Sequence, residues 1–161
     1  MTRTARINYY NAVIQPIMDY GSLVWGTTTL ANIDTIVRLQ KRAARLIMDK
    51  RWDTPSQPLF KELDITPFPE RVKKAKAKLV YKSLSDKTPV YIRDKLKLVK
   101  DVHEINTRSR AHNLILPKFK KSFGQRTFSY SAASIWNELP NAIKELNSVN
   151  SFVKELKLIT V

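Results

Sequence analysis

The segment from Asn32 to Lys50 constrains the fold most, because its apolar residues follow the spacing of an α-helix. They recur at intervals of three and four residues, as on a helix face that is turned toward a core. These residues are Ile33, Ile36, Val37, Ala43, Ala44 and Ile47. Gln40 is the one polar residue on this stripe, and Thr29 or Asn32 has a suitable side chain to cap the first turn. The segment therefore predicts a long amphipathic helix.

The same segment carries a second stripe, and that stripe is entirely basic. At 100° per residue it falls about 150° from the apolar stripe, where side chains meet solvent or a partner. Its members are Arg38, Lys41, Arg42 and Arg45, with no acidic residue among them. Like charges at this spacing repel by a few tenths of a kcal/mol per pair. We therefore expect a partner to supply negative charge, and a phosphate backbone is favoured over a merely solvated basic face.

Composition places this helix in a strongly basic chain that has enough apolar residues for a core. The 161 residues have a net charge of +15 and are 43% hydrophobic, which fits one compact domain over residues 1–161. The excess of Lys and Arg is spread over both halves of the sequence, so it is not a detachable tail. A folded body with this charge is typically balanced by RNA, DNA or an anionic membrane.

Several classes of protein are disfavoured by what the sequence lacks. There is no cysteine, which excludes disulfides and zinc sites with thiolate ligands. No stretch reaches the roughly 20 apolar residues of a membrane span, and the N-terminus has no signal-peptide core. We expect an intracellular protein, nuclear or cytoplasmic and not secreted, with no membrane partner, no small-molecule substrate and no cofactor. Since Met1 leads almost directly into a helical pattern, the chain is also compatible with being the tail of something longer.

The remaining sequence predicts a mainly α fold with one small β-hairpin, as a compact domain of five to six helices. Helical patterns cover residues 3–18, with a kink or break at Pro16, then 59–63, 70–84, 132–139 and 149–158, and another helix starts after Pro89. Aromatic and β-branched runs at 114–119 and 126–130, separated by a turn with Gly124, predict the hairpin. A helical part thus spans 3–99, and a loop, the hairpin and closing helices span 100–161.

Further basic residues extend the candidate binding surface. In the 70–84 helix, Val72, Ala75 and Leu79 are expected inward, with basic residues outward. The basic candidates outside the first helix are Arg71, Lys74, Lys78, Arg108, Lys118, Lys120, Lys121 and Arg126. Basic residues beside aromatic ones, such as Arg51 with Trp52, are able to hold phosphate while the ring stacks on an unpaired base. Most aromatic residues, including Trp25, Trp136, Phe119 and Phe128, are more simply explained as core.

Motifs for catalysis are missing from the sequence. The acidic residues are scattered singly, whereas two-metal phosphoryl transfer needs clustered carboxylates. His103 and His112 lie nine residues apart in polar sequence and are interpreted as surface residues. With three glycines in total, no known glycine-rich phosphate cradle fits. An intact enzyme of unknown type would need Asp19, Asp34, Asp49 or Asp53 to converge at metal-sharing distance.

Blocks of sequence along the chain resemble a known family. Residues 10–26 (YNAVIQPIMDYGSLVWG) and 39–47 (LQKRAARLI) are similar to segments downstream of the catalytic domain in reverse transcriptases of non-LTR retrotransposons, the jockey-like LINE elements of animals. Later blocks follow in the same order at 58–63, 106–109, 128–130, 136–140 and 151–154. The resemblance spans about residues 9–158.

The resemblance implies the thumb-like and C-terminal regions of such a reverse transcriptase, which would help to hold template RNA and target DNA. The palm motif with paired aspartates is absent, as are the fingers, the endonuclease domain and a cysteine-histidine knuckle, so no catalytic residue is carried over. What transfers is the helix with Arg38, Lys41, Arg42 and Arg45 as a nucleic-acid-facing surface. The 106–109 loop transfers as well, with no role named for it.

Two functions therefore remain open. The first is a non-catalytic C-terminal part of a retrotransposon-encoded RNA-directed DNA polymerase, or a degenerate copy of it, that binds RNA or DNA template or target with little sequence preference. The second is a structural module that braced a polymerase core, with charge for solubility and an exposed apolar patch where that core docked.

Overall fold

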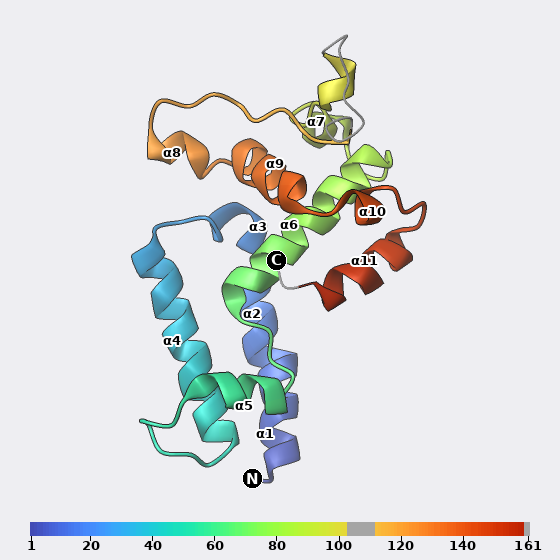
Figure 1. Cartoon of the computed structure of the whole chain (residues 1–161). Coiled ribbons are helices and arrows are strands. Elements are labelled where there is room, and N and C mark those ends of the chain that lie inside the picture. The colour runs from blue at the N-terminus through green and yellow to red at the C-terminus, as the bar shows by residue number, and fades with distance from the viewer. Residues whose placement is uncertain (103–111, 160–161) are drawn as a thin grey trace. The chain divides into compact units, whose positions relative to one another are not determined.

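Figure 1 presents a computed structural model of the chain, which describes residues 1–102 and 112–159. The described residues form α-helices joined by turns and short loops, with no β-strand and one isolated antiparallel bridge between Leu98 and Leu114. The prediction of a mainly α fold is confirmed. The helices are shorter and more numerous than the five to six expected. None of those described is both long and apolar enough to cross a bilayer.

The chain divides into two compact units, Met1–Val72 and Lys73–Val161, and the division falls within helix α6 (Phe68–Leu84). The division expected from the sequence, between residues 99 and 100, separates two parts of one domain and stays a prediction. The apolar periodicity of residues 70–84 is continuous and shows nothing of the boundary within α6. That the whole chain folds as a single domain stays a prediction.

The first unit begins with a helical run whose winding changes ahead of Pro16. It consists of α1 (Arg3–Tyr9), the π-helical segment η1 (Tyr10–Ile14) and α2 (Gln15–Asp19). The Gln15 N–H donates to the Tyr10 carbonyl, which is the i to i−5 pattern of a π-turn. Proline lacks an N–H and crowds the preceding turn, so a local change of winding is a known accommodation. The predicted interruption thus takes the form of a π-segment.

The two-stripe segment forms α4 (Leu30–Ile47), which follows the short helix α3 (Ser22–Trp25). Thr29 is the N-cap, and its side chain accepts from the Asn32 N–H. The polar exception on the apolar stripe, Gln40, is almost fully buried. Its Nε2 donates to the Tyr10 hydroxyl at 3.0 Å, and its Oε1 accepts from the Phe68 N–H at 2.7 Å. Gln40 thereby satisfies a backbone donor at the start of α6, which has no partner within that helix.

A small core closes the first unit around these contacts. Helix α5 (Ser56–Glu62) starts earlier than predicted, because Pro58 stands in its first turn, where backbone N–H groups need no intrahelical partner. Figure 1 shows α5 crossing the lower part of α4. The buried apolar residues of this cluster are Tyr10, Ala44, Ile47, Leu59, Phe60, Leu63 and Ile65. Burial raises the pKa of the Tyr10 hydroxyl, partly offset by its hydrogen bond with Gln40.

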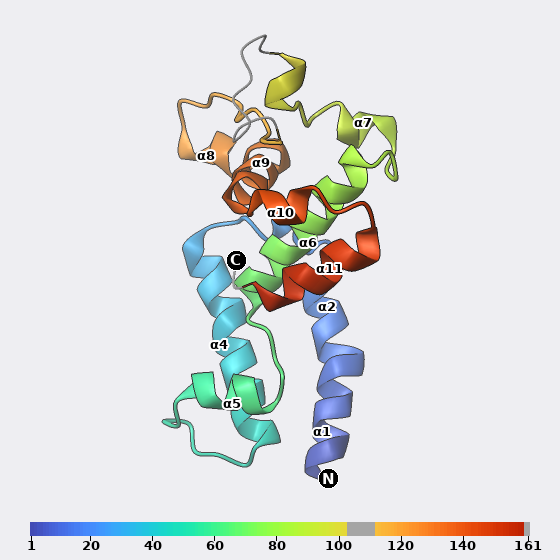
Figure 2. The same cartoon turned by 45° about the vertical axis from the view of Figure 1, so that its right-hand side comes forward.

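The second unit packs most of α6 with α9 (Phe128–Glu138), α10 (Asn141–Lys144) and α11 (Val149–Leu158). Trp136 and Phe152 lie at its centre, and Tyr81 stacks on Phe152 with ring centroids 4.3 Å apart. Shorter elements complete the unit: α7 (Val90–Arg93), the 3-10 turn η2 (Val99–Asp101) and α8 (Ser122–Gln125). The closing helix begins and ends where the sequence predicted, and Figure 2 shows its course beside α10.

The predicted β-hairpin over 114–130 is wrong. Residues 122–125 form α8, and residues 128–130 are the first turn of α9. Alternation over Phe128, Ser129 and Tyr130 is too short to outweigh the helical period of the residues that follow. The segment predicted as the first strand pairs with another part of the chain, through the bridge between Leu114 and Leu98. The Asn137 side-chain amide accepts from the N–H of Leu114 and donates to its carbonyl.

The buried face of α6 also differs from the prediction. Val72 is buried as expected, whereas Ala75 and Leu79 are half-buried. Lys76 is fully buried instead, and its Nζ donates to Ser131 Oγ at 2.7 Å. A lysine is rarely buried without an ionic partner. The sequence pattern therefore gave no reason to place it inside.

Candidate nucleic-acid interface

The four basic residues predicted to share one face of α4 line a single surface pocket in the first unit. Two further residues from the segment after the helix line it as well, and the full lining is Arg38, Lys41, Arg42, Arg45, Leu46, Lys50 and Trp52. The pocket has a volume of about 600 Å³, within the size range of ligand sites. Its lining contains five cations and no carboxylate. The arrangement therefore favours an anionic group.

The cations differ in what holds them. Arg38 hydrogen-bonds Thr35 Oγ1 at 3.1 Å along its own helix, and Arg45 Nε donates to the Thr54 carbonyl at 2.8 Å. Lys41 and Arg42 make no hydrogen bond and no ion pair with the residues that the structure describes. Two cations are thus fixed by the fold, and two keep all their donors for a partner.

The end of α4 brings the last two lining residues into place. Asp49 adopts a left-handed conformation with φ of 54°, and the Lys50 N–H donates to the Arg45 carbonyl at 2.9 Å. This 6-to-1 hydrogen bond is the Schellman motif, which ends a helix and reverses the chain. The reversal returns Lys50 and Trp52 to the basic face. Lys50 was not among the predicted site residues, whereas the sequence named Trp52, beside Arg51, as a ring able to stack on a base. Asp49 gave no cue to the reversal because glycine is the usual residue there.

Carboxylates near this surface are engaged with other arginines. Asp49 pairs with Arg6 at 3.4 Å, and Asp53 pairs with Arg51 at 3.6 Å. Both carboxylates are open to solvent, so the two pairs contribute little to stability. They nevertheless leave the five cations of the pocket without an ion-pair partner among the residues of the described structure.

The predicted site residues on α6 have different environments. Arg71 is mostly buried and pairs with Asp19 inside the first unit, so its expected outward position is wrong. Lys74 is half-buried and its Nζ lies 3.4 Å from the Lys157 carbonyl, in the second unit. Lys78 is exposed. The helix turns its apolar face differently from the prediction, and this rotation explains why Arg71 is drawn inward.

The remaining candidates lie in the second unit or outside the described residues. Lys118, Lys120, Lys121 and Arg126 are exposed along the segment around α8. Phe119 is packed edge-on against Tyr130, and Gly124 passes so close to the Phe119 ring that a Cβ there would lie 2.4 Å from it. Arg108, the 106–109 loop and His103 fall outside the described residues. His112 is partly exposed beside Glu145, as a surface histidine would be.

An apolar pocket of about 320 Å³ lies elsewhere in the first unit, between the η1–α2 run and α4. Ile17 and Leu39 line it although they are 68% and 55% exposed. Large apolar side chains with this exposure, gathered at one concave surface, are typical of interaction sites.

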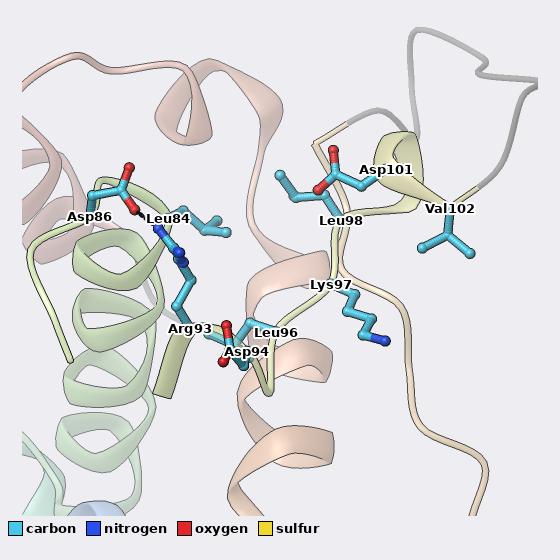
Figure 3. A pocket seen from close by; sticks show the side chains of 9 residues that line it. All are labelled: Leu84, Asp86, Arg93, Asp94, Leu96, Lys97, Leu98, Asp101 and Val102. Carbon is cyan, nitrogen blue, oxygen red and sulfur yellow. Dashed lines mark hydrogen bonds and ion pairs between the residues drawn. The ribbon is translucent and has the colours of Figure 1, made fainter. Parts of the chain in front are cut away.

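A pocket of about 710 Å³, lined by both charged and apolar residues, lies in the second unit and is drawn in Figure 3. Asp86 faces Arg93 and pairs with it, whereas the carboxylates of Asp94 and Asp101 lie apart. Within residues 1–102 and 112–159, no group of three or more histidine, cysteine or acidic side chains is placed to hold a metal ion. The four aspartates named from the sequence do not converge in such a group.

Comparison of the chain with family models, with curated proteins and with solved structures finds no match.

Proposed function

We propose that the chain binds RNA or DNA without catalysing a reaction, through phosphate contacts made by the basic face of α4. One observation carries the proposal: four helix cations and Lys50 line one pocket that contains no carboxylate. Five like charges in one concave surface raise the local concentration of a polyanion. Contacts of this kind position a nucleic acid and do not read its sequence.

Two of these cations are held by the protein and two are free to move, and this difference supports binding to a phosphate backbone. Arg38 and Arg45 are held by hydrogen bonds to the protein, so part of their conformational entropy is lost before any ligand arrives. Lys41 and Arg42 retain every donor. An arginine presents a planar fork to a phosphate, and a lysine acts as a compact point charge. The pocket thus combines two oriented arginines with cations that adapt to the path of the strand.

We also propose, from the sequence resemblance, that this chain corresponds to the post-palm, thumb-like and C-terminal region of a LINE-type RNA-directed DNA polymerase. In that context the basic face of α4 would grip template RNA or target DNA. The blocks at 10–26 and 39–47 contain the π-segment and the C-terminal half of the two-stripe helix, so the resemblance and most of the basic pocket's helix residues involve the same part of the chain.

The salt dependence of binding tests the proposal. Four phosphates neutralised by α4 contribute a slope of log K against log salt of about −3 for single strands and about −4 for duplexes. We expect fluorescence anisotropy with a labelled RNA or DNA to show at least this slope. A binding curve that does not change between low and moderate salt would contradict the proposal.

A charge-removal variant connects binding to this pocket. Lys41→Gln together with Arg42→Gln removes two cations that hold no part of the fold, and it should reduce the magnitude of the slope by about 1.5. The matched control is Lys61→Gln with Lys154→Gln, which removes two exposed charges that do not line the pocket. Equal effects of the two variants would show that binding depends on net charge and not on this site.

The alternative is a structural module that packs against a polymerase core and does not bind nucleic acid itself. The apolar pocket with Ile17 and Leu39 favours this alternative, because exposed apolar surface is expected where a protein partner docks. The alternative predicts no shift of labelled RNA or DNA at physiological salt. It also predicts that Ile17→Ser with Leu39→Ser improves the solubility of the isolated chain.

A further inference from the structure

The three tryptophans of the chain have sharply different environments. Trp136 is buried at the centre of the second unit, and its Nε1 donates to the His112 carbonyl. Trp25 stacks on Phe68 with ring centroids 5.0 Å apart. Trp52 is 81% exposed, yet it lines the basic pocket together with Lys50 and the cations of α4. An exposed indole loses the favourable burial that usually accounts for a tryptophan. Burial in the core therefore does not account for its position.

The segment that carries Trp52 is tied at both ends to the last turn of α4. The Lys50 N–H donates to the Arg45 carbonyl, and the Arg45 side chain donates to the Thr54 carbonyl. A further backbone bond joins the Thr54 N–H to the Arg51 carbonyl at 3.2 Å. The three residues between Lys50 and Thr54 have little freedom. The indole is consequently presented beside the cations at a low entropic cost for a ligand that meets it.

We propose that this pocket selects single-stranded over double-stranded nucleic acid, with the Trp52 indole stacking on an unpaired base while Arg42, Lys41 and Lys50 hold the adjacent phosphates. The inference rests on the proposed function, since it assumes that the pocket binds phosphates. The two parts match the chemistry of a nucleotide, which has a flat π-face beside an anionic group. In a duplex each base is already stacked and paired, so its face is not available to an exposed indole.

The pocket is also suited in size and charge to one flipped-out nucleotide or to the end of a strand. Its volume of about 600 Å³ exceeds what a phosphate alone would fill. Leu46 is an apolar member of the lining beside Trp52, and it gives a base apolar surface to contact. No side chain of the lining carries an amide or a carboxylate, the groups that read the edges of adenine and cytosine, and the proposal assigns its arginines and lysines to phosphates. The selectivity should therefore be for strandedness and not for sequence.

The sharpest experiment compares three oligonucleotides of equal length with the full chain: oligo-dT, an abasic strand of the same charge and a blunt duplex. Base stacking contributes enough to change affinity by about 5- to 150-fold per base. We expect oligo-dT to bind at least fivefold more tightly than the abasic strand at the same salt. Oligo-dT should quench the emission of Trp52, and the abasic strand should not.

Variants of the indole separate stacking from charge. Trp52→Ala should reduce the affinity for oligo-dT by about fivefold or more, leave binding to the abasic strand unchanged and leave the salt slope unchanged. Trp52→Phe should restore part of the affinity, because it keeps a ring. The matched control is Tyr20→Ala, which removes an aromatic ring that is 87% exposed in the same unit and does not line the pocket. Both positions are exposed enough for the fold to tolerate the change.

The outcomes distinguish this inference from the function on which it rests. Equal, salt-dependent binding of oligo-dT and the abasic strand, unaffected by Trp52→Ala, would overturn the stacking inference and leave phosphate binding intact. Absence of binding to every strand would overturn both. Tighter binding to vesicles of phosphatidylserine than to oligo-dT, lost in Trp52→Ala, would assign the pocket to an anionic membrane surface and overturn the inference as well.

Discussion

Arg45 Nε donates a 2.8 Å hydrogen bond to the carbonyl of Thr54, nine residues further along the chain. This contact gives one of the four cations of α4 a structural role in addition to its charge. It closes the segment 46–54 against the helix and so keeps Lys50 and Trp52 at the basic pocket. The proposed binding surface is therefore held in shape by one of its own arginines.

Replacing Arg45 by lysine should loosen this segment while keeping the charge. A lysine has no guanidinium group and so lacks the Nε–H that Arg45 donates to the Thr54 carbonyl. The loss of one hydrogen bond costs about 1 kcal/mol. Local opening should then be about fivefold more frequent. We expect trypsin to cleave after Lys50 or Arg51 about fivefold faster in this variant. Arg42→Lys, at an exposed position that bonds nothing in the described structure, is the control and should leave the rate unchanged.

Replacing Gln40 by methionine should destabilise the first unit by about 1 to 3 kcal/mol. Methionine has a similar length but leaves the Phe68 N–H and the Tyr10 hydroxyl without their partner, and an unsatisfied buried polar group carries this cost. Urea unfolding measures the change. Tyr10→Phe and the double variant complete a cycle, in which strict additivity would contradict a direct Gln40–Tyr10 interaction.

Replacing Lys76 by methionine should stabilise the protein at neutral pH. Burial lowers the pKa of the Lys76 ammonium from 10.5 to about 8. Below pH 8 the folded protein carries the buried charge of Lys76, which lowers the free energy of unfolding by its full amount. Between pH 8 and 10.5 the unfolded chain holds a proton that the folded chain lacks, so the contribution of this group to stability improves as the pH rises.

We therefore expect the methionine variant to gain about 2 kcal/mol over the original chain at pH 7, and the gain should shrink toward pH 10.5. Chemical denaturation at both pH values measures the difference. Lys78→Met, on the exposed side of the same helix, is the control and should show no such dependence. The same gain at pH 7 and pH 10 would mean that Lys76 is not the titrating group.

Replacing Asp64 by glycine should stabilise the protein by about 0.5 to 1 kcal/mol. Asp64 has a φ of 52° at the end of α5, where the Ile65 N–H donates to the Phe60 carbonyl at 2.8 Å. Glycine adopts this left-handed conformation without steric cost, and alanine does not. Asp64→Ala should accordingly lower the thermal unfolding midpoint while Asp64→Gly raises it. A lower midpoint for both would indicate that the carboxylate itself is needed.

The sequence predicted those elements whose residues repeat over three or more turns. The two-stripe pattern of α4, the continuous pattern of α6 and the ends of α11 were all visible from apolar spacing. Elements of one turn, such as α8 and α10, lie below the length at which periodicity is informative. The start of the equally short α7 was predicted from Pro89 and not from periodicity. The hairpin error likewise comes from a short pattern, because three alternating residues were weighed without the helix that follows them.

Helix ends were harder to predict, because glycine, the usual residue just after the end of a helix, is missing there. Asp49, Asp64 and Asp86 all adopt φ near 55° after α4, α5 and α6, at positions where glycine is the common choice. Each permits the backbone bonds of a Schellman motif, and an aspartate is one of the few other residues that enters this region. The sequence has three glycines, and none of them stands at these three positions, so it did not predict these chain reversals.

The sequence by itself determined that the chain is mainly helical and that Arg38, Lys41, Arg42 and Arg45 share a face, because both follow from residue spacing along one helix. Tertiary structure alone decided that Lys50 and Trp52 join that face, that Arg71 turns inward to Asp19, and that Gln40 and Lys76 are buried. These features depend on where a chain reverses and on which groups meet across elements. Periodicity within a single helix contains no information about either.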